Sequence, residues 1–259
     1  MITPKKIYFL SDFHLGAPDP ASSLERERKI VAFLEDIRHE AAIIFIVGDM
    51  FDFWYEYRKV VPKGHVRLLG KLAELTDSGI SIHFFVGNHD MWMNDYFSEE
   101  LNIHTYFEPR NFEFGGKKFL IGHGDGLGPG DSGYKMLKKV FRNPFSQWMF
   151  GVLPPYMGMG LANYFSKKSR EATGKEEEVF LGEENEWLIT YCKELLKKSH
   201  YDYMVFGHRH LPIDYTLENG SRYINLGDWI KYFTYAVFDG QQLTLLSRYP
   251  GDGDKIVRK

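Results

Sequence analysis

Cysteine is almost missing from this chain of 259 residues, which contains only Cys192. One thiol excludes a disulfide framework and fits a reducing compartment. A strong excess of charge is missing too: the net charge of −3 argues against a general nucleic-acid binder, so no nucleic-acid partner is expected. The stretch MITPKKIYFL runs directly into a strand-like segment without the long apolar run of a secretory signal, so none is expected.

The composition, 44% hydrophobic and 26% charged residues, is that of an ordinary globular protein. Short apolar runs alternate with helical patterns, which predicts an α/β (or α+β) layer architecture. Ser22 and Glu25 have the spacing of a capping box and predict the start of the first helix. The expected helices are 22–41, 66–75 and 183–198, and the expected strands are 7–10, 43–47, 80–86, 203–206 and a hairpin of 112–114 with 119–121. We interpret residues 1–259 as one domain.

Residues 131–175 fit neither pattern and are interpreted as an insertion over the fold. Within 134–170 there are seven Lys or Arg and no Asp or Glu, so the rest of the chain carries −10. Residues 143–166 are uncharged, but Pro154–Pro155 and several glycines interrupt them. A membrane-spanning helix is not expected from a stretch that is broken in its middle.

Five apolar runs end in polar side chains that suit metal binding. Open α/β sheets bind ligands at the carboxyl ends of their strands, where the loops converge. Pairs such as D-x-H and H-x-H place two side chains on the same side of an extended backbone, so each pair can hold one ion. The polar residues at these five ends are Asp12 and His14, Asp49 and Asp52, Asn88, His89 and Asp90, His123 and Asp125, and His208 and His210.

Carboxylate, amide and imidazole ligands together suit a six-coordinate ion such as Mn²⁺, Fe²⁺ or Zn²⁺, whereas a structural zinc site usually contains cysteines. Any one of these histidines, taken alone, could be an ordinary core or surface residue. Their shared position after five strands favours a metal site.

The ordered series D-x-H, G-D-x-x-D, G-N-H-D, G-H-G-D and G-H-x-H resembles the calcineurin-like metallophosphoesterase superfamily over almost the whole chain. The resemblance implies a four-layer αββα sandwich with two divalent ions, for which Mn²⁺ is the first expectation and Zn²⁺ or Fe²⁺ the alternatives. It also implies that one ion is held by Asp12, His14, Asp49 and His210, and that Asp49 bridges to a second ion completed by Asn88, His123 and His208.

Two such ions supply a hydroxide nucleophile and stabilise the phosphoryl oxygens, so no side-chain nucleophile is expected. His89 is the expected catalytic residue, which stabilises transition-state charge or protonates the leaving oxygen. The resemblance makes Asp52 its orienting partner, and Asp90 is expected to be structural.

The insertion resembles the helical lid of the UDP-2,3-diacylglucosamine hydrolase family of lipid A synthesis, through Asp131, Gly133 and Tyr134 at its start and the stretch 169–172. That resemblance implies hydrolysis of a UDP-linked diacyl sugar to 2,3-diacylglucosamine 1-phosphate (lipid X) and UMP. Much of that family has Arg at the position of His89 and Glu at that of Asp52. The substrate-binding residues implied are Asn88, His89, Asp131, Tyr134, Arg142, Ser169, Thr173, Lys175 and His208.

The apolar and basic character of the insertion also predicts contact with acyl chains and with an anionic membrane surface. We therefore expect a cytoplasmic protein at the inner face of a bacterial inner membrane, with no obligate protein partner. Two alternatives stay open: a metallophosphoesterase for another lipid-linked or nucleotide phosphoester, and a scaffold that has lost catalysis. A packed helical subdomain is the plainer interpretation of the insertion's apolar residues.

Overall fold

Two six-stranded sheets form the centre of the computed structural model, which describes residues 5–129, 132–161, 164, 166, 179–249 and 255–259. The first sheet has the strand order β11-β10-β1-β2-β3-β4 and the second has the order β12-β8-β9-β7-β6-β5. The strands are β1 (Lys6–Leu10), β2 (Ala41–Val47), β3 (Ser81–Phe85), β4 (His104–Tyr106), β5 (Arg110–Phe114), β6 (Lys117–Gly122), β7 (Tyr203–Phe206), β8 (Pro212–Thr216), β9 (Arg222–Leu226), β10 (Thr234–Phe238), β11 (Leu243–Ser247) and β12 (Val257–Arg258).

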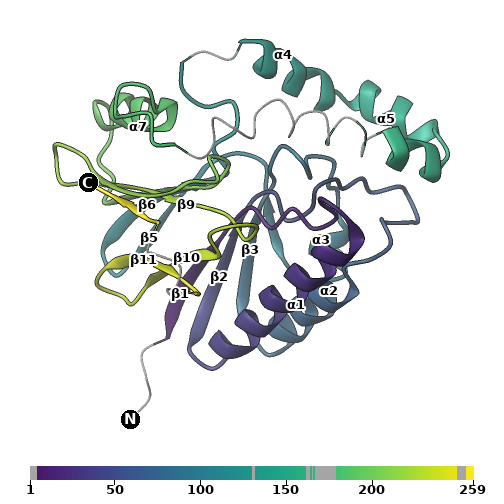
Figure 1. Ribbon diagram of the computed structural model, residues 1–259, viewed down its shortest axis with the longest axis horizontal. Helices are drawn as coiled ribbons and strands as arrows, with labels where there is room; N and C mark the ends of the chain where they lie inside the picture. The colour runs from purple at the N-terminus through teal and green to yellow at the C-terminus, as the bar shows by residue number, and fades with distance from the viewer. Residues whose placement is uncertain (1–4, 130–131, 162–163, 165, 167–178, 250–254) are drawn as a thin grey trace.

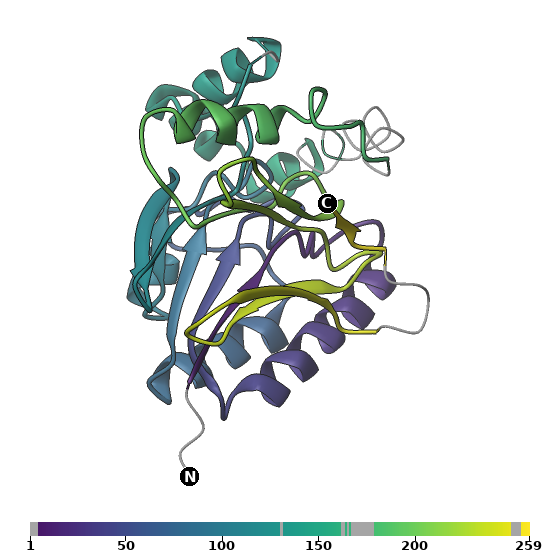
Figure 2. The ribbon, with the colours of Figure 1, turned by 90° about the vertical axis from the view of Figure 1, so that its left-hand side faces the viewer.

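Helices cover the outer faces of both sheets (Figures 1 and 2). Helices α1 and α2 pack on the first sheet and α7 packs on the second. The helices are α1 (Pro20–Ile37), α2 (Val66–Asp77), α3 (Tyr96–Glu99), α4 (Ser132–Phe141), α5 (Pro144–Val152) and α7 (Trp187–Leu196).

The alternation of side chains along the strands builds these layers. In β1, Ile7 and Phe9 face the second sheet, whereas Tyr8 and Leu10 join the core under α1 and α2. Because successive strand residues point to opposite faces, a run with no polar position is what a strand buried on both sides requires. The four-layer αββα fold is therefore confirmed.

Parallel pairing aims the strand ends at one edge of the molecule. In the first sheet β1, β2, β3 and β4 run parallel, and in the second β6, β7 and β9 do so. Their carboxyl ends lie toward the top of Figure 1, beneath α4 and α5. This arrangement brings together loops that are far apart in the sequence.

Several element boundaries differ from the sequence predictions. Helix α1 begins at Pro20 and is capped by Asp19, whose Oδ1 accepts hydrogen bonds from the backbone N–H of Ala21 and Ser22. The Ser22 capping box is thus wrong, because an acidic cap followed by proline at the first helical position is the better start. The helix ends at Ile37 rather than 41, since β2 already begins at Ala41. The 183–198 helix is shorter at both ends (Trp187–Leu196), and the predicted hairpin is confirmed as β5–β6.

The insertion contributes α4, α5 and further helical residues at 155–161. Side chains of the main fold also bind backbone carbonyls of the insertion: the Tyr55 hydroxyl donates to the Gln147 carbonyl (2.7 Å) and the Trp92 indole N–H to the Phe141 carbonyl (2.7 Å). Among the described residues, no helix has the length and apolarity needed to cross a bilayer.

Candidate metal centre

Left-handed backbone conformations mark the residues that follow β1, β2 and β7. Asp12, His14, Asp49, His208 and His210 have φ angles of 56°, 44°, 51°, 65° and 57°. A non-glycine residue in this region is strained, and strain of this kind gathers at functional sites. The turns aim all five side chains into one small volume at the edge where the strands end.

Asp12, His14, Asp49 and His210 form the first cluster, in which potential ligand atoms lie within 4.8 Å of one another. The Nε2 atoms of His14 and His210 are 3.2 Å apart, and Asp12 Oδ1 lies 3.7 Å from the first and 3.3 Å from the second. Asp49 Oδ2 is 3.5 Å from His14 Nε2. All four side chains thus direct a potential ligand atom into the same small volume.

Asp49 also belongs to a second cluster, with His123 and His208. Its Oδ2 atom, which faces His14 in the first cluster, lies 3.3 Å from His123 Nε2. The same imidazole nitrogen is 3.1 Å from Asn88 Oδ1. One carboxylate oxygen therefore faces both clusters, as a bridging ligand would.

The glycines before these ligands are needed for close approach. A Cβ atom on Gly87 would lie 2.6 Å from the Asp49 backbone nitrogen, and one on Gly207 would lie 2.6 Å from Asp12 Oδ2. A Cβ atom on Gly48 would collide with the His123 ring. Real Cβ atoms do not approach this closely, so the G-D, G-N-H and G-H spacings reflect the crowding of the site.

The carboxylates of the site hold protons on two of its imidazoles. Burial lowers the pKa of His14, but the carboxylates of Asp12, Asp52 and Asp49 outweigh it and raise the pKa to about 10. Burial likewise opposes the charged form of His123, yet Asp49 and Asp12 raise its pKa to about 10. In the absence of an ion, protons therefore balance the negative charge that a cation would balance.

Within this site, two buried atoms have no hydrogen-bond partner among the described residues: Asp12 Oδ1 and His14 Nδ1. An unsatisfied buried carboxylate oxygen is costly, whereas a cation beside it satisfies it. Together with the mixed carboxylate, imidazole and amide donors, this orphaned oxygen shows that the residues suit a divalent metal centre.

Asp228 contacts the His210 ring on its Nδ1 side, and the sequence analysis did not predict this residue. Its Oδ2 lies 3.4 Å from His210 Nδ1, which leaves Nε2 of that ring for an ion. Its Oδ1 accepts hydrogen bonds from the backbone N–H of Ile230, Lys231 and Tyr232. The signal is present in the sequence, because Gly227–Asp228 follows β9 just as Gly48–Asp49 follows β2.

His89 and Asp52 lie next to the first cluster. His89 Nδ1 donates to the Asp52 backbone carbonyl (3.0 Å), while Asp52 Oδ1 is farther away, at 3.8 Å. The carbonyl is thus the closer orienting group, and the carboxylate is shared with His14 Nδ1 at 3.7 Å. Asp90 accepts hydrogen bonds from the backbone N–H of Gly87 (2.8 Å) and Met50 (2.8 Å), so it ties two ligand loops together, as a structural residue does.

The other predicted substrate-binding residues are placed less completely. Arg142 forms an ion pair with Glu108 and donates to the Phe107 carbonyl (2.7 Å). The backbone of Tyr134 lies in α4. Asp131, Ser169, Thr173 and Lys175 lie outside the described residues.

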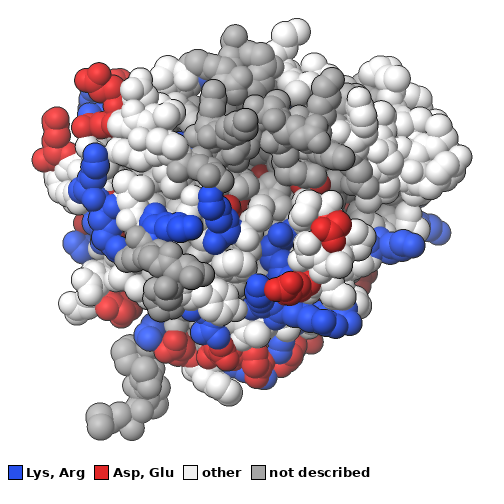
Figure 3. Space-filling model, viewed as in Figure 1, with Lys and Arg blue, Asp and Glu red and all other residues white. Residues whose placement is uncertain are grey.

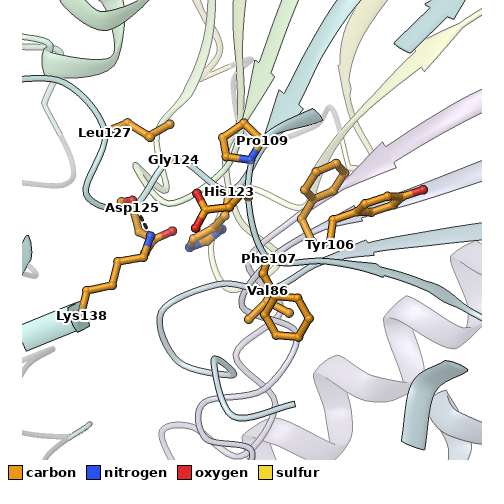
Figure 4. Close-up of a pocket in the computed structure, with 11 residues that line it drawn as sticks. Val86, Tyr106, Phe107, Pro109, His123, Gly124, Asp125, Leu127 and Lys138 are labelled. Atoms are coloured by element: carbon orange, nitrogen blue, oxygen red, sulfur yellow. Dashed lines mark hydrogen bonds and ion pairs between the residues drawn. The ribbon is translucent and has the colours of Figure 1, made fainter. Parts of the chain in front are cut away.

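A pocket opens beside His123, between the ends of β3 and β6 and the insertion. Figure 4 shows Lys138 of α4 reaching from one side to Asp125 of the G-H-G-D stretch. The ammonium lies 2.6 Å from Asp125 Oδ2 and 3.0 Å from the Asp125 carbonyl. Tyr106, Phe107 and Pro109 line the far wall.

The calcineurin-like phosphoesterase family model matches residues 5–212, which include every predicted metal ligand. This chain is a calcineurin-like phosphoesterase. The phosphoesterase is 43% identical over 254 residues to a UDP-2,3-diacylglucosamine hydrolase of Porphyromonas gingivalis, with 93% of this chain and 97% of the relative covered. A UDP-2,3-diacylglucosamine hydrolase of Ectopseudomonas mendocina is 30% identical over 238 residues, which cover 91% of this chain and 95% of the relative.

Two solved structures that the phosphoesterase resembles are distant from it in sequence. Vps29 from Entamoeba histolytica, complexed with zinc, is 12% identical with a TM-score of 0.46, and 96% of this chain and 94% of that one are covered. The phosphoesterase Yfce from E. coli is 16% identical with a TM-score of 0.44, with 93% and 92% covered. Similarity at this level adds nothing to the family assignment.

Proposed function

We propose that the chain hydrolyses the diphosphate of UDP-2,3-diacylglucosamine to 2,3-diacylglucosamine 1-phosphate and UMP. The single observation that carries this proposal is the pairing of the Asp49-centred ligand clusters with an apolar insertion directly above them. The first feature suits phosphoester cleavage, and the second suits a substrate with acyl chains. The similarity to each of the two hydrolase relatives extends over nearly the full length of this chain and of the relative.

The insertion exposes apolar side chains to an unusual degree. Phe145 and Trp148 of α5 are each 64% exposed and stack on one another, and no residue of α5 is buried. In Figure 3 the region of α5, at the upper right, is almost free of charged side chains. An apolar surface of this kind marks a binding site for a lipid or another partner. We infer that residues 131–175 act as a lid that contacts the acyl chains.

Two divalent ions, with Mn²⁺ proposed first and Zn²⁺ or Fe²⁺ as alternatives, would supply an activated water and charge stabilisation at the diphosphate. Asp12, His14, Asp49 and His210 would hold one ion, and Asp49, Asn88, His123 and His208 the other. Asp49 keeps the two ligand sets in register, because its Oδ2 faces both.

His89 acts on the leaving group. Its Nδ1–H donates to the Asp52 carbonyl, so the ring can deliver a proton from Nε2 only in its doubly protonated form, and burial, which lowers the pKa of His89, makes that form a stronger acid. The His89 backbone N–H also donates to Asp49 Oδ1 (2.9 Å), which fixes the ring relative to the bridging carboxylate. A positioned imidazole of this kind can stabilise transition-state charge or protonate the departing oxygen.

We also propose that the protein associates with the inner face of a bacterial inner membrane. The exposed apolar side chains of α4 and α5 would enter the interface, where the substrate is. The basic residues contribute less than their number indicates, since Lys138 and Arg142 already have acidic partners in Asp125 and Glu108.

A second candidate is a metallophosphoesterase for a different lipid-linked diphosphate. The observation in its favour is the His89–Asp52 pair, which replaces the Arg–Glu combination of much of the hydrolase family. This candidate shares the metal centre and the apolar lid and differs only in the head group.

Comparison of substrates tests the proposal. Rates with Mn²⁺ should be measured on UDP-2,3-diacylglucosamine, on UDP-N-acetylglucosamine, which lacks the acyl chains, and on bis(p-nitrophenyl) phosphate. The proposal expects kcat/KM to be highest for the acylated nucleotide by orders of magnitude. Equal values for the acylated and chain-free nucleotides would contradict it.

A further inference from the structure

Ser166, a residue of the insertion, contacts both Asp52 and His89. Its Oγ donates a hydrogen bond to Asp52 Oδ2 (2.9 Å) and lies 3.3 Å from His89 Nδ1. The residue is 9% exposed, whereas Leu161 and Tyr164, which precede it in the insertion, are 45% and 62% exposed. A small polar side chain is therefore buried against two groups of the site, whereas the described side chains of Leu161 and Tyr164 just before it are exposed.

The hydrogen bond from Ser166 is one constraint on the direction in which the Asp52 carboxylate faces. Rotation about the last bond of an aspartate is soft, so a carboxylate without a partner can sample many orientations. With Ser166 on Oδ2, the other oxygen of Asp52 is directed at two imidazoles: it lies 3.7 Å from His14 Nδ1 and 3.8 Å from His89 Nδ1. At these distances the Asp52 carboxylate acts on both rings through its charge, which favours a proton on each Nδ1 and so leaves Nε2 as the free nitrogen of a neutral ring.

Other contacts hold the insertion in place without Ser166. Lys138 pairs with Asp125, and the Lys135 ammonium donates to the Gly128 carbonyl (2.6 Å). Tyr55 and Trp92 bind α5 and the end of α4 through carbonyl oxygens. Removing one hydroxyl therefore leaves the insertion attached, and its effect on the reaction is expected through the two groups that the hydroxyl contacts, of which Asp52 is the nearer.

We propose that Ser166 is a positioning residue, through which the insertion orients the Asp52 carboxylate toward His89 and His14. The inference rests on the proposed catalytic role of His89 but not on the identity of the lipid. It makes the insertion part of the phosphoryl-transfer machinery as well as a surface for acyl chains.

The test compares Ser166→Ala with Ser146→Ala, a serine of α5 in the same insertion, on bis(p-nitrophenyl) phosphate with Mn²⁺. Loss of one hydrogen bond to a charged group corresponds to roughly a tenfold fall in rate. We expect that fall in kcat for Ser166→Ala, with KM and bound metal unchanged, and wild-type values for Ser146→Ala.

A double-mutant cycle separates positioning from a general structural effect. In an Asp52→Ala background there is no carboxylate to orient, so Ser166→Ala should change kcat less than about twofold. A wild-type kcat for Ser166→Ala, or the same fall in both backgrounds, would overturn the inference. Parallel assays on UDP-2,3-diacylglucosamine distinguish the role of Ser166 from the identity of the substrate. An enzyme that cleaves only the generic phosphodiester contradicts the lipid substrate, whereas the result for Ser166 remains valid.

Discussion

Raising the pH should strengthen metal binding steeply, because an ion must displace protons from the ligands. In the metal-free fold the pKa values of His14 and His123 are raised to about 10 by the neighbouring carboxylates. Both imidazoles are therefore protonated between pH 6.5 and 8. A ligand nitrogen must be free of its proton, so each of these rings loses one when an ion binds.

The size of the effect follows from the number of protons released. Each proton makes the dissociation constant fall about tenfold per pH unit. Release of one proton from each of two fully protonated rings predicts that the dissociation constant falls about 100-fold per pH unit. Because both rings interact with the same Asp49 carboxylate, we expect a measured release between one and two protons, or a fall of about 10- to 100-fold per unit between pH 6.5 and 8.

Isothermal titration calorimetry of Mn²⁺ into chelator-treated protein measures this directly. Heats in buffers of different ionisation enthalpy give the number of protons released. His123→Asn should reduce that number by about one. His83→Gln is the matched control. Burial and the neighbouring His104 lower the pKa of His83 to about 4, so its ring is neutral between pH 6.5 and 8 and has no second proton to release. An affinity that is flat from pH 6.5 to 8 would refute the reasoning.

The same shifts set the pH dependence of the metal-free fold. A histidine whose pKa is higher in the folded state stabilises that state below its ordinary value of 6.5, and the contribution is lost as the pH rises toward about 10. The melting temperature of chelator-treated protein should therefore decrease from pH 7 to pH 10. The metal-loaded protein, whose imidazoles are already deprotonated, should show a smaller decrease.

Three further predictions concern the site and the insertion. Asp49→Ala should lower activity by several orders of magnitude and reduce the bound metal measured by elemental analysis, since its Oδ2 faces both clusters; full activity with both metals retained would contradict this. His89→Ala should lower kcat ~10²–10⁴-fold with metal content unchanged, and metal loss in this variant would show that its role is misassigned. Phe145→Ser combined with Trp148→Ser should raise KM for the acylated substrate and weaken binding to anionic vesicles, while the hydrolysis of bis(p-nitrophenyl) phosphate stays unchanged. The control is Val66→Ser, at a position of α2 that is 69% exposed. Equal losses of activity on both substrates would assign Phe145 and Trp148 a structural role.

The proposed ligand set can be predicted from the sequence because each of its residues lies just past an apolar run. Asp12, Asp49, Asn88, His123 and His208 all follow strands whose buried residues have no polar member near the end. Parallel strands in one sheet deliver their ends to one edge, so their convergence can be inferred before any distance is known. The alternation of apolar runs with helical patterns makes an α/β layer architecture accessible as well, whereas the four-layer αββα arrangement was implied by the family resemblance.

Contacts across the insertion are not accessible in this way. Ser166 reaches Asp52 across 114 positions of sequence, and Lys138 reaches Asp125 from a helix whose orientation no periodicity determines. For Arg142 the sequence favours a substrate phosphate as the partner of the positive charge, but in the structure the side chain forms an ion pair with Glu108. Such pairings depend on how the insertion packs, which is a tertiary property.

Phosphorus NMR of UDP-2,3-diacylglucosamine incubated with the protein and Mn²⁺ tests the central claim most directly. The account predicts that the two diphosphate signals decay together and are replaced in equal amounts by the phosphomonoester signals of UMP and 2,3-diacylglucosamine 1-phosphate, and that a chelator or Asp49→Ala stops the conversion. Intact diphosphate under conditions in which the same preparation cleaves bis(p-nitrophenyl) phosphate, or release of UDP in place of UMP, would contradict it.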